Sequence, residues 1–275
     1  MNISTKRAFL DTEDGQILYC ISGEGAALVL LHQNFRSIDE FRELIPIFAQ
    51  KRRVIAMDLL GLGDSDKPPR MYSIPEYAQT VIWLLDELGI KTASILGHHT
   101  GAYIAGEVAA AYPERVEKLI ICNVDDFNEE EKAAITNEFT QGSLTIKEDG
   151  GHLIERWLDR ASYIGSAELK HRWVLDEMKC FGYPWYAPLA VINYSLFMKE
   201  RFRLIKCPTL ILSGLEDVKQ LEKLGFSKPE NRRFILEVIP HGKMVEIEDG
   251  TICMMNQIPE EISKQVIAFL DRTGI

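Results

Sequence analysis

The 275-residue sequence has no long apolar run. No window approaches the roughly 18 to 20 uninterrupted apolar residues of a membrane span. Residues 1–10 also lack the apolar segment that forms the centre of a secretory signal. We therefore expect a cytoplasmic protein without a membrane partner.

Paired cysteines and long basic blocks are also missing. The five cysteines are dispersed and never form a C-x-x-C pair, which argues against disulfides and against a zinc cluster. We expect neither a metal nor another cofactor. The formal net charge is −10, and no Lys- or Arg-rich block offers a surface for phosphates, so nucleic acid is not an expected partner. The expected partner is a small-molecule substrate, and the sequence leaves monomer and homodimer open.

Short apolar runs alternate with helical patterns along most of the chain. This rhythm predicts βα units and a largely parallel sheet. The predicted strands cover residues 17–21, 27–31, 53–57, 92–96, 118–122, 209–213 and 244–247, and a final helix covers 259–270. With 46% hydrophobic residues, the chain can bury the core of one large α/β domain, residues 1–275.

The alternation stops between residues 125 and 206. Helical patterns appear there at 129–140 and 153–164, but no further strand is evident until residue 209. We interpret residues 125–206 as an inserted helical lid, or cap. Asp125 and Asp126, which follow the strand that ends at residue 122, are interpreted as loop residues.

One pentapeptide combines two glycines with two histidines: Gly97-His98-His99-Thr100-Gly101. An apolar run precedes it, and an Ala-rich helical pattern at 102–111 follows it. This is the strand, sharp turn and helix of a G-x-S-x-G nucleophile elbow, with His99 at the position of the serine. The residue at the apex of such a turn points into the active site, so His99 determines which chemistry is available.

Four segments together resemble the α/β-hydrolase superfamily in order and spacing. They are LVLLHQNF at 28–35, VIAMDLLGLGDSDKP at 54–68, the elbow itself, and PTLILSGLED at 208–217. The resemblance implies an α/β-hydrolase fold, with a mostly parallel central sheet flanked by helices and an inserted helical lid. It also implies that the turn at 32–34 supplies an oxyanion-hole amide, although Gln33 stands there in place of the usual glycine.

The same resemblance implies a triad in the order nucleophile, acid, histidine. Asp217 matches the acid. The histidine position falls at Thr251 or Ile252, so no imidazole stands there. His241 precedes the strand at 244–247, which predicts that it lies at the opposite edge of the sheet. The chain thus lacks the imidazole of the last loop and carries one at the elbow instead.

These two departures have a joint interpretation. Histidine is longer than serine, so His99 can occupy the space in which a triad imidazole lies between nucleophile and acid. We predict that one ring nitrogen faces Asp217 and that the other acts as a general base toward the pocket, without a protein nucleophile. The backbone amides of Gln33 and Thr100 are predicted to stabilise an oxyanion.

Further candidates for the substrate pocket come from the turn, the lid and the last loop. Asn34 either faces the substrate or stabilises its loop. His98 either contributes to the pocket or packs beneath the turn, and His152 either enters the site as an acid or base or lies in solvent. The predicted pocket residues are Asn34, His98, His152, Trp157, Thr251 and Ile252.

The sequence favours a cofactor-independent enzyme that hydrolyses a small carbonyl compound, such as an ester, a lactone or a C–C bond. A lyase that abstracts a proton with the same base remains an alternative. So does a catalytically inactive ligand-binding or sensing protein with the same fold. A conventional serine esterase ranks last, because the elbow has no serine.

Overall fold

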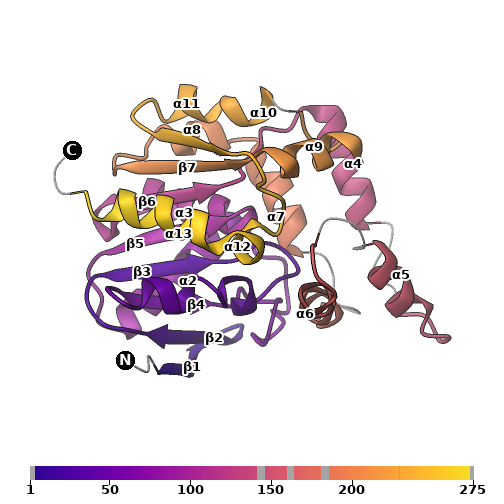
Figure 1. Ribbon diagram of the computed structural model, residues 1–275, viewed down its shortest axis with the longest axis horizontal. Coiled ribbons are helices and arrows are strands. Elements are labelled where there is room, and N and C mark those ends of the chain that lie inside the picture. The colour runs from indigo at the N-terminus through magenta and orange to yellow at the C-terminus, as the bar shows by residue number, and fades with distance from the viewer. Residues whose placement is uncertain (1–3, 141–145, 160–163, 181–185, 229, 273–275) are drawn as a thin grey trace.

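The computed structural model describes residues 4–140, 146–159, 164–180, 186–228 and 230–272. Its core is an eight-stranded sheet in the order β1-β2-β4-β3-β5-β6-β7-β8 (Figure 1). β1 and β2 form an antiparallel hairpin, β2 pairs antiparallel with β4, and all other neighbours are parallel. The strands are β1 (Thr5–Thr12), β2 (Gly15–Ser22), β3 (Ala27–Leu31), β4 (Arg53–Met57), β5 (Ala93–His98), β6 (Val116–Cys122), β7 (Thr209–Gly214) and β8 (Lys243–Ile247).

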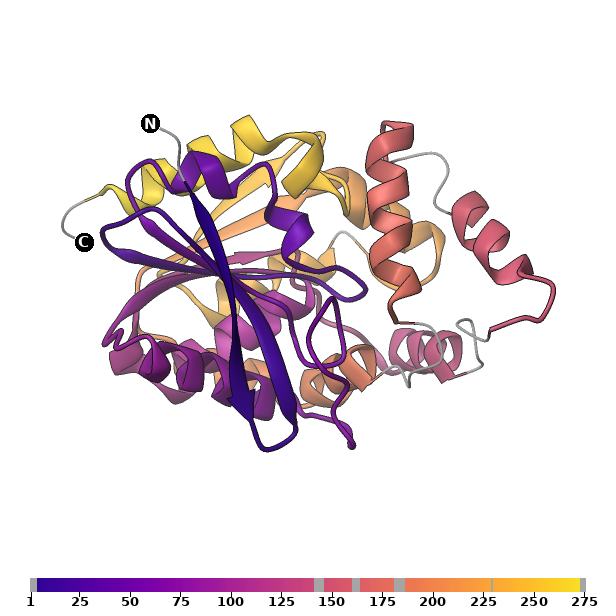
Figure 2. The same cartoon turned by 90° about the horizontal axis from the view of Figure 1, so that it is seen from below.

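Helices cover both faces of the sheet (Figure 2). α2 (Ile74–Glu87) and α3 (Thr100–Ala111) pack on one face, and α1 (Ile45–Phe48) and α13 (Pro259–Leu270) pack on the other. Because both faces are covered, the central strands β3 and β5 are buried along their whole length, as expected for parallel strands. The shorter elements around them are η1 (Ile38–Phe41), η2 (Pro113–Arg115), α9 (Leu215–Lys223), α10 (Glu230–Arg233), α11 (Ile235–Val238) and α12 (Met254–Gln257).

A group of helices lies in the sequence between β6 and β7, which are paired neighbours in the sheet. They are α4 (Glu129–Thr140), α5 (Gly151–Asp159), α6 (Ala167–Met178), α7 (Tyr186–Ser195) and α8 (Met198–Phe202). α4, α5 and α6 lie beyond the end of the sheet at which β5 leads into α3 (Figures 1 and 2). Arg172 on α6 pairs with Asp39 at 2.9 Å and with Glu43 at 2.6 Å, which attaches this helix to the segment after β3. The role of residues 125–206 as a lid stays a prediction.

The strand predictions agree closely with the structure, apart from the first strand. β1 was not predicted because it is an exposed edge strand in which Leu10 alone is buried, so it lacks a regular apolar alternation. α5 begins at Gly151, two positions before the predicted start, and residues 160–163 of the predicted helix lie outside the described residues. His241 lies before β8, with its Nε2 3.1 Å from the carbonyl of Cys207 before β7, so it is at the edge opposite the elbow as predicted.

Within the part of the chain that the structure describes, no helix combines the length and the apolar character that a membrane span requires.

Candidate active site

The elbow holds His99 in a strained backbone conformation, with φ 46° and ψ −115°. A non-glycine residue rarely adopts a positive φ, which costs about 1–3 kcal/mol and persists only when the surroundings fix it. Here the N–H of His99 donates to the carbonyl of Cys122 at 2.9 Å, and its carbonyl accepts from the N–H of Ala102 at 2.7 Å. β6 and the first turn of α3 therefore hold the turn from both sides.

Both glycines of the elbow are required by close backbone contacts. A Cβ on Gly97 would lie 2.1 Å from the carbonyl oxygen of Gly101, and a Cβ on Gly101 would lie 2.0 Å from that of Leu31. No side chain fits at these distances. The pattern that suggested an elbow in the sequence thus has a direct steric cause.

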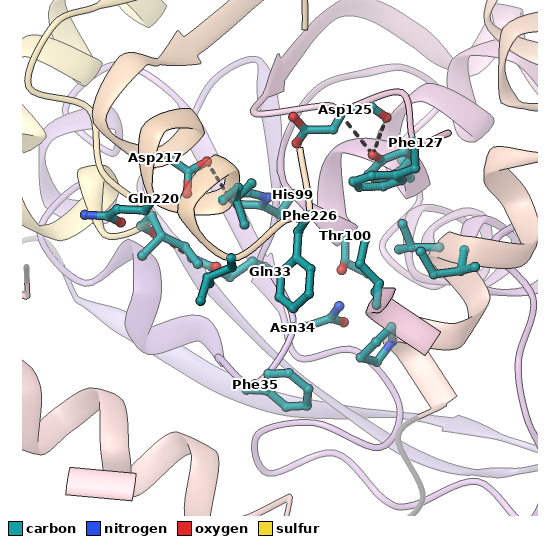
Figure 3. Close-up of a pocket in the computed structure, with 18 of the residues that line it drawn as sticks. Gln33, Asn34, Phe35, His99, Thr100, Asp125, Phe127, Asp217, Gln220 and Phe226 are labelled. Carbon is teal, nitrogen blue, oxygen red and sulfur yellow. Dashed lines mark hydrogen bonds and ion pairs between the residues drawn. The ribbon is translucent and has the colours of Figure 1, made fainter. Parts of the chain in front are cut away.

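His99 and Asp217 meet across the carboxyl end of the sheet (Figure 3). Nε2 of His99 lies 3.1 Å from Oδ2 of Asp217, which stands in the first turn of α9. The contact has the length of an ion pair, but Nε2 has no well-aligned hydrogen-bond acceptor among the described residues. Because Nε2 faces the acid, Nδ1 is the ring nitrogen left for a ligand. The catalytic role of the pair stays a prediction.

Arg232 on α10 is a residue of this site that sequence reasoning missed. Its side chain is buried, its Nη2 donates to Oδ2 of Asp217, and its Nε donates to Oδ1 of Asp125 at 2.9 Å. Asp125, interpreted above as a loop residue, is therefore part of a buried ion-pair cluster. Two acids that follow adjacent parallel strands were the available signal, because buried carboxylates need a cation.

The electrostatics of this cluster favour an ionised Asp217. Burial alone would raise the pKa of its carboxyl group, but the adjacent His99 imidazole, when protonated, and the Arg232 guanidinium, which also donates a hydrogen bond to Oδ2, outweigh burial. The pKa of Asp217 is therefore held well below its usual range.

His98 lies beneath the turn, so the prediction that it belongs to the substrate pocket is wrong. Its side chain is fully buried, its Nδ1 contacts Oε1 of Glu40, and its Nε2 accepts from Nδ2 of Asn123 at 3.2 Å. Oδ1 of Asn123 accepts from the N–H of Gly214 and from Arg232, which fixes the direction of the amide. His98 is therefore neutral with its proton on Nδ1, in agreement with a pKa that burial lowers despite the opposing charge of Glu40.

The backbone amide of Gln33 does not serve as predicted. Its N–H donates to Oε2 of Glu40 at 2.8 Å, so in this structure it is not available to an oxyanion. The side-chain amide of Gln33 donates to Oε1 of Glu40 at 3.0 Å and to the carbonyl of Ile252 at 2.9 Å. Thr100 is the first residue of α3, so its N–H has no acceptor within the helix. Its role in an oxyanion hole stays a prediction.

A cavity of about 470 Å³ opens beside His99. More than half of the lining residues are aromatic or aliphatic and the others are polar or charged, a combination that suits a small organic molecule with polar groups. The lining residues are Gln33, Asn34, Phe35, His99, Thr100, Tyr103, Asp125, Phe127, Ile135, Arg156, Trp173, Pro188, Val191, Ile192, Asp217, Gln220, Leu221, Leu224, Phe226 and Ile252.

Three other predicted pocket residues do not line this cavity. Nδ1 of His152 accepts from the N–H of Lys147 at 3.2 Å, near the start of α5. The ring of Trp157 lies under the ammonium group of Lys170, at 4.4 Å. Thr251 forms hydrogen bonds within the last loop. These interactions turn the three side chains to other parts of the structure, so their assignment to the pocket is corrected.

Asn34 is the clearest polar group in the cavity wall. Its Oδ1 is buried and has no hydrogen-bond partner among the described residues. A buried carbonyl oxygen without a donor is unfavourable, which suggests that a ligand supplies one. Arg156 on α5 also reaches the cavity, and its Nε lies 3.2 Å from Oε2 of the buried Glu177.

The described residues contain no group of three or more His, Cys, Asp or Glu side chains that could hold a metal ion.

Comparison with known proteins agrees with this fold. The family model of the alpha/beta hydrolase fold matches residues 26–163, half of the chain. The chain belongs to this family. A solved structure, the enol-lactonase from Burkholderia xenovorans, has a TM-score of 0.76 and 21% identity, over 96% of this chain and 100% of that one.

Two curated relatives differ in how much of the chain they match. An uncharacterised protein of Mycobacterium tuberculosis is 38% identical over 101 residues, which are 37% of this chain and 30% of that protein. The (E)-2-((N-methylformamido)methylene)succinate hydrolase of Acinetobacter baylyi is 22% identical over 259 residues, 93% of this chain and 94% of that protein. The alignment with the mycobacterial protein thus spans less than a third of its length. The chain and the Acinetobacter hydrolase are similar over nearly their whole lengths.

Proposed function

We propose that the protein hydrolyses a small carbonyl compound with His99 as general base and Asp217 as the carboxylate that orients it. The observation that carries this proposal is the 3.1 Å contact between His99 Nε2 and Asp217 Oδ2 in the wall of a cavity. In that orientation, the neutral imidazole has its proton on Nε2 and a free electron pair on Nδ1.

The proposed reaction needs no protein nucleophile. Nδ1 of His99 takes a proton from water while the water oxygen attacks the substrate carbonyl carbon. Asp217 stabilises the imidazolium that forms, and the N–H of Thr100 at the start of α3 faces the developing oxyanion. The intermediate then collapses, the bond to the leaving group breaks, and the imidazolium returns its proton to that group.

The cavity indicates the kind of substrate. A volume of about 470 Å³ with aromatic and aliphatic walls suits a largely apolar molecule of modest size, such as an ester, a lactone or a ketone that undergoes C–C cleavage. Relatives named as hydrolases support the reaction class: the Acinetobacter protein is a hydrolase of a succinate derivative, and the Burkholderia protein is an enol-lactonase.

A ligand-binding or sensing function is the second candidate. It is favoured by the Gln33 amide, which donates to Glu40 instead of facing the cavity. A site with fewer oxyanion donors stabilises a transition state less well. In this alternative the cavity binds a ligand without converting it. A lyase that uses Nδ1 of His99 for proton abstraction needs the same dyad and differs only in the substrate.

The test is turnover of a panel of activated esters, thioesters and lactones between pH 5 and 9. We expect His99→Ala and Asp217→Asn each to lower turnover by roughly 10²- to 10⁴-fold. The matched control is His152→Ala, which removes an imidazole that does not line the cavity and is expected to retain turnover. We also expect serine-directed phosphonates to leave no adduct on residue 99.

The outcomes separate the candidates. Full turnover in both His99→Ala and Asp217→Asn would exclude the dyad. Ligands that raise the melting temperature without being converted would favour the binding protein. Conversion of a substrate without uptake of water would favour the lyase.

A further inference from the structure

One oxygen of Asp217 serves two partners. Oδ2 accepts from Nη2 of Arg232 and also lies 3.1 Å from Nε2 of His99. Oδ1 of the same carboxylate has no hydrogen-bond partner among the described residues. The position of Oδ2 opposite His99 therefore depends on the orientation of the Arg232 guanidinium.

The guanidinium of Arg232 is held by several acceptors. Nε donates to Asp125 at 2.9 Å, and Nη1 donates to the carbonyl of Gly214 at 2.9 Å and to Oδ1 of Asn123 at 3.1 Å. The side chain is about 3% exposed, so solvent screens its charge little. A planar guanidinium with this many fixed bonds has one orientation, and it transmits that orientation to Asp217.

The charges around His99 come from several elements. Asp217 on α9 and Arg232 on α10 are the nearest ion pair, and Asp125 after β6 shares the same guanidinium. The neutral His98 ring lies 4.7 Å away between centroids, with Glu40 behind it. A further charged pair beside the cavity is formed by Arg156 and Glu177. Arg232 is thus the cation that offsets the carboxylate in contact with His99.

We propose that Arg232 is a positioning residue of the His99–Asp217 pair, which fixes Oδ2 against the imidazole and divides its charge between Asp217 and Asp125. The consequence is that His99 feels an attenuated negative charge and more readily stays a neutral base. Without Arg232, Asp217 would turn freely and its full charge would favour the imidazolium before any substrate is bound. This inference deepens the proposed function and rests on it for its catalytic meaning.

The test follows the titration of the His99 ring by NMR in the full-length protein, with the signal assigned by its loss in His99→Ala. We expect Arg232→Met to raise the midpoint by about one pH unit relative to the wild-type protein, because an adjacent positive charge is removed. Asp125→Asn removes a negative charge and is expected to lower the midpoint. Arg232→Lys keeps the charge and is expected to stay close to the wild type. A merely structural role for Arg232 would not give opposite shifts.

A double variant keeps the test decisive. If Arg232→Met does not fold, the double variant Arg232→Met with Asp125→Asn removes one charge of each sign from the buried cluster. Its midpoint is expected to rise less than one unit, because Arg232 pairs directly with Asp217, the carboxylate in contact with His99, whereas Asp125 pairs with Arg232. The inference would be overturned if the midpoint of Arg232→Met equals that of the wild type. If Arg232→Met does not fold, the same result in the double variant would overturn it. Shifts of the same sign in Arg232→Met and Asp125→Asn would also overturn it.

The titration is independent of turnover, so it separates this inference from the proposed function. Opposite midpoint shifts in a protein without turnover on any substrate would support the role of Arg232 and contradict the hydrolase. If turnover depends on His99 but the NMR midpoints of the Arg232 and Asp125 variants equal that of the wild type, the hydrolase is supported and the role of Arg232 is contradicted. When both hold, the acidic limb of the pH–rate profile moves with the NMR midpoint in each variant.

Discussion

The backbone N–H of Gln33 donates to Oε2 of Glu40 at 2.8 Å, directly beneath the elbow. The other oxygen of Glu40 contacts Nδ1 of His98, so one buried carboxylate connects the two turns that surround the cavity. A negative charge at this point opposes a developing oxyanion nearby. We therefore predict that an oxyanion is stabilised by the N–H of Thr100 and by the side-chain amide of Asn34, two residues that line the cavity.

The ionisation of Glu40 leads to a prediction on acid stability. Burial would raise its pKa, but His98, through its hydrogen bond and through the positive charge that it carries once protonated in acid, together with Arg36 and the Gln33 amide, outweighs burial and lowers the pKa to about 2. The folded pKa lies below the unfolded value, so Glu40 contributes stability above about pH 4.5 that is lost as the pH falls through 2. A shift of this size corresponds to roughly 3 kcal/mol. Glu40→Gln should therefore be less stable at pH 7 and lose less stability on acidification.

Urea unfolding at pH 7, 4 and 3 measures this difference. The control is Glu114→Gln, which changes an exposed carboxylate in the same way. If Glu40→Gln and the wild type lose the same free energy of unfolding between pH 4 and 3, the carboxylate does not stabilise the turn as proposed.

The elbow glycines give a prediction with a sharp steric cause. In Gly101→Ala the new Cβ would meet the carbonyl of Leu31 at 2.0 Å, so β3 and α3 must separate. We expect a loss of about 3 kcal/mol or more in the free energy of unfolding. Gly89→Ala is the matched control: it has φ +63° but no atom within 4 Å, so only backbone strain of about 1–2 kcal/mol is expected. Equal losses in the two variants would show that β3 and α3 separate at little cost.

Asn34 should affect function more than stability. Its Oδ1 has no partner among the described residues, so Asn34→Ala removes no hydrogen bond from the free protein. We expect the melting temperature to change little and kcat/KM for a hydrolysed substrate to fall about tenfold, the effect of one hydrogen bond. Asn34→Asp keeps the shape and an acceptor oxygen of the side chain but loses the amide donor, so its kcat/KM should fall at least as far if that donor stabilises the oxyanion. A destabilised Asn34→Ala variant with normal kinetics would indicate a loop-stabilising role instead.

How far the sequence predicts this molecule depends on the range of each interaction. Strands such as β3 were predicted because consecutive apolar residues carry their own signal, whereas β1 is an exposed edge without one. His99 and Asp217 could be brought together because both follow parallel strands and so lie at one edge of the sheet. Which of the 31 Lys and Arg residues neutralises Asp217 is not encoded locally, and for this reason Arg232 was missed. The assignment of the Gln33 amide to the oxyanion hole failed because its acceptor, Glu40, is reached only through the folding of the loop between them, which the local sequence pattern does not indicate.

The last prediction concerns the attachment of α6, which supplies Trp173 to the cavity wall. The single hydroxyl of Ser37 donates to the carboxylate of Asp176 on this helix, with its Oγ 2.9 and 3.0 Å from the two carboxylate oxygens, and Oδ2 of Asp176 lies 3.6 Å from Nε of Arg36. Burial is the largest effect on its carboxyl group and raises its pKa to about 6, although Arg36 and Ser37 oppose the rise. The folded protein therefore binds a proton at Asp176 more tightly than the unfolded chain does.

The sign of the pH dependence follows from that difference. Stability from protonated Asp176 is fully present below about pH 4 and is lost as the pH rises through 6, by up to roughly 3 kcal/mol. Asp176→Asn cannot ionise, so its free energy of unfolding should improve relative to the wild type between pH 4 and 7. Asp86→Asn, on an exposed acid, serves as the control. A difference between Asp176→Asn and the wild type that stays constant from pH 4 to 7 would mean that Arg36 keeps Asp176 ionised throughout, and that α6 is held to the sheet domain by a permanent ion pair.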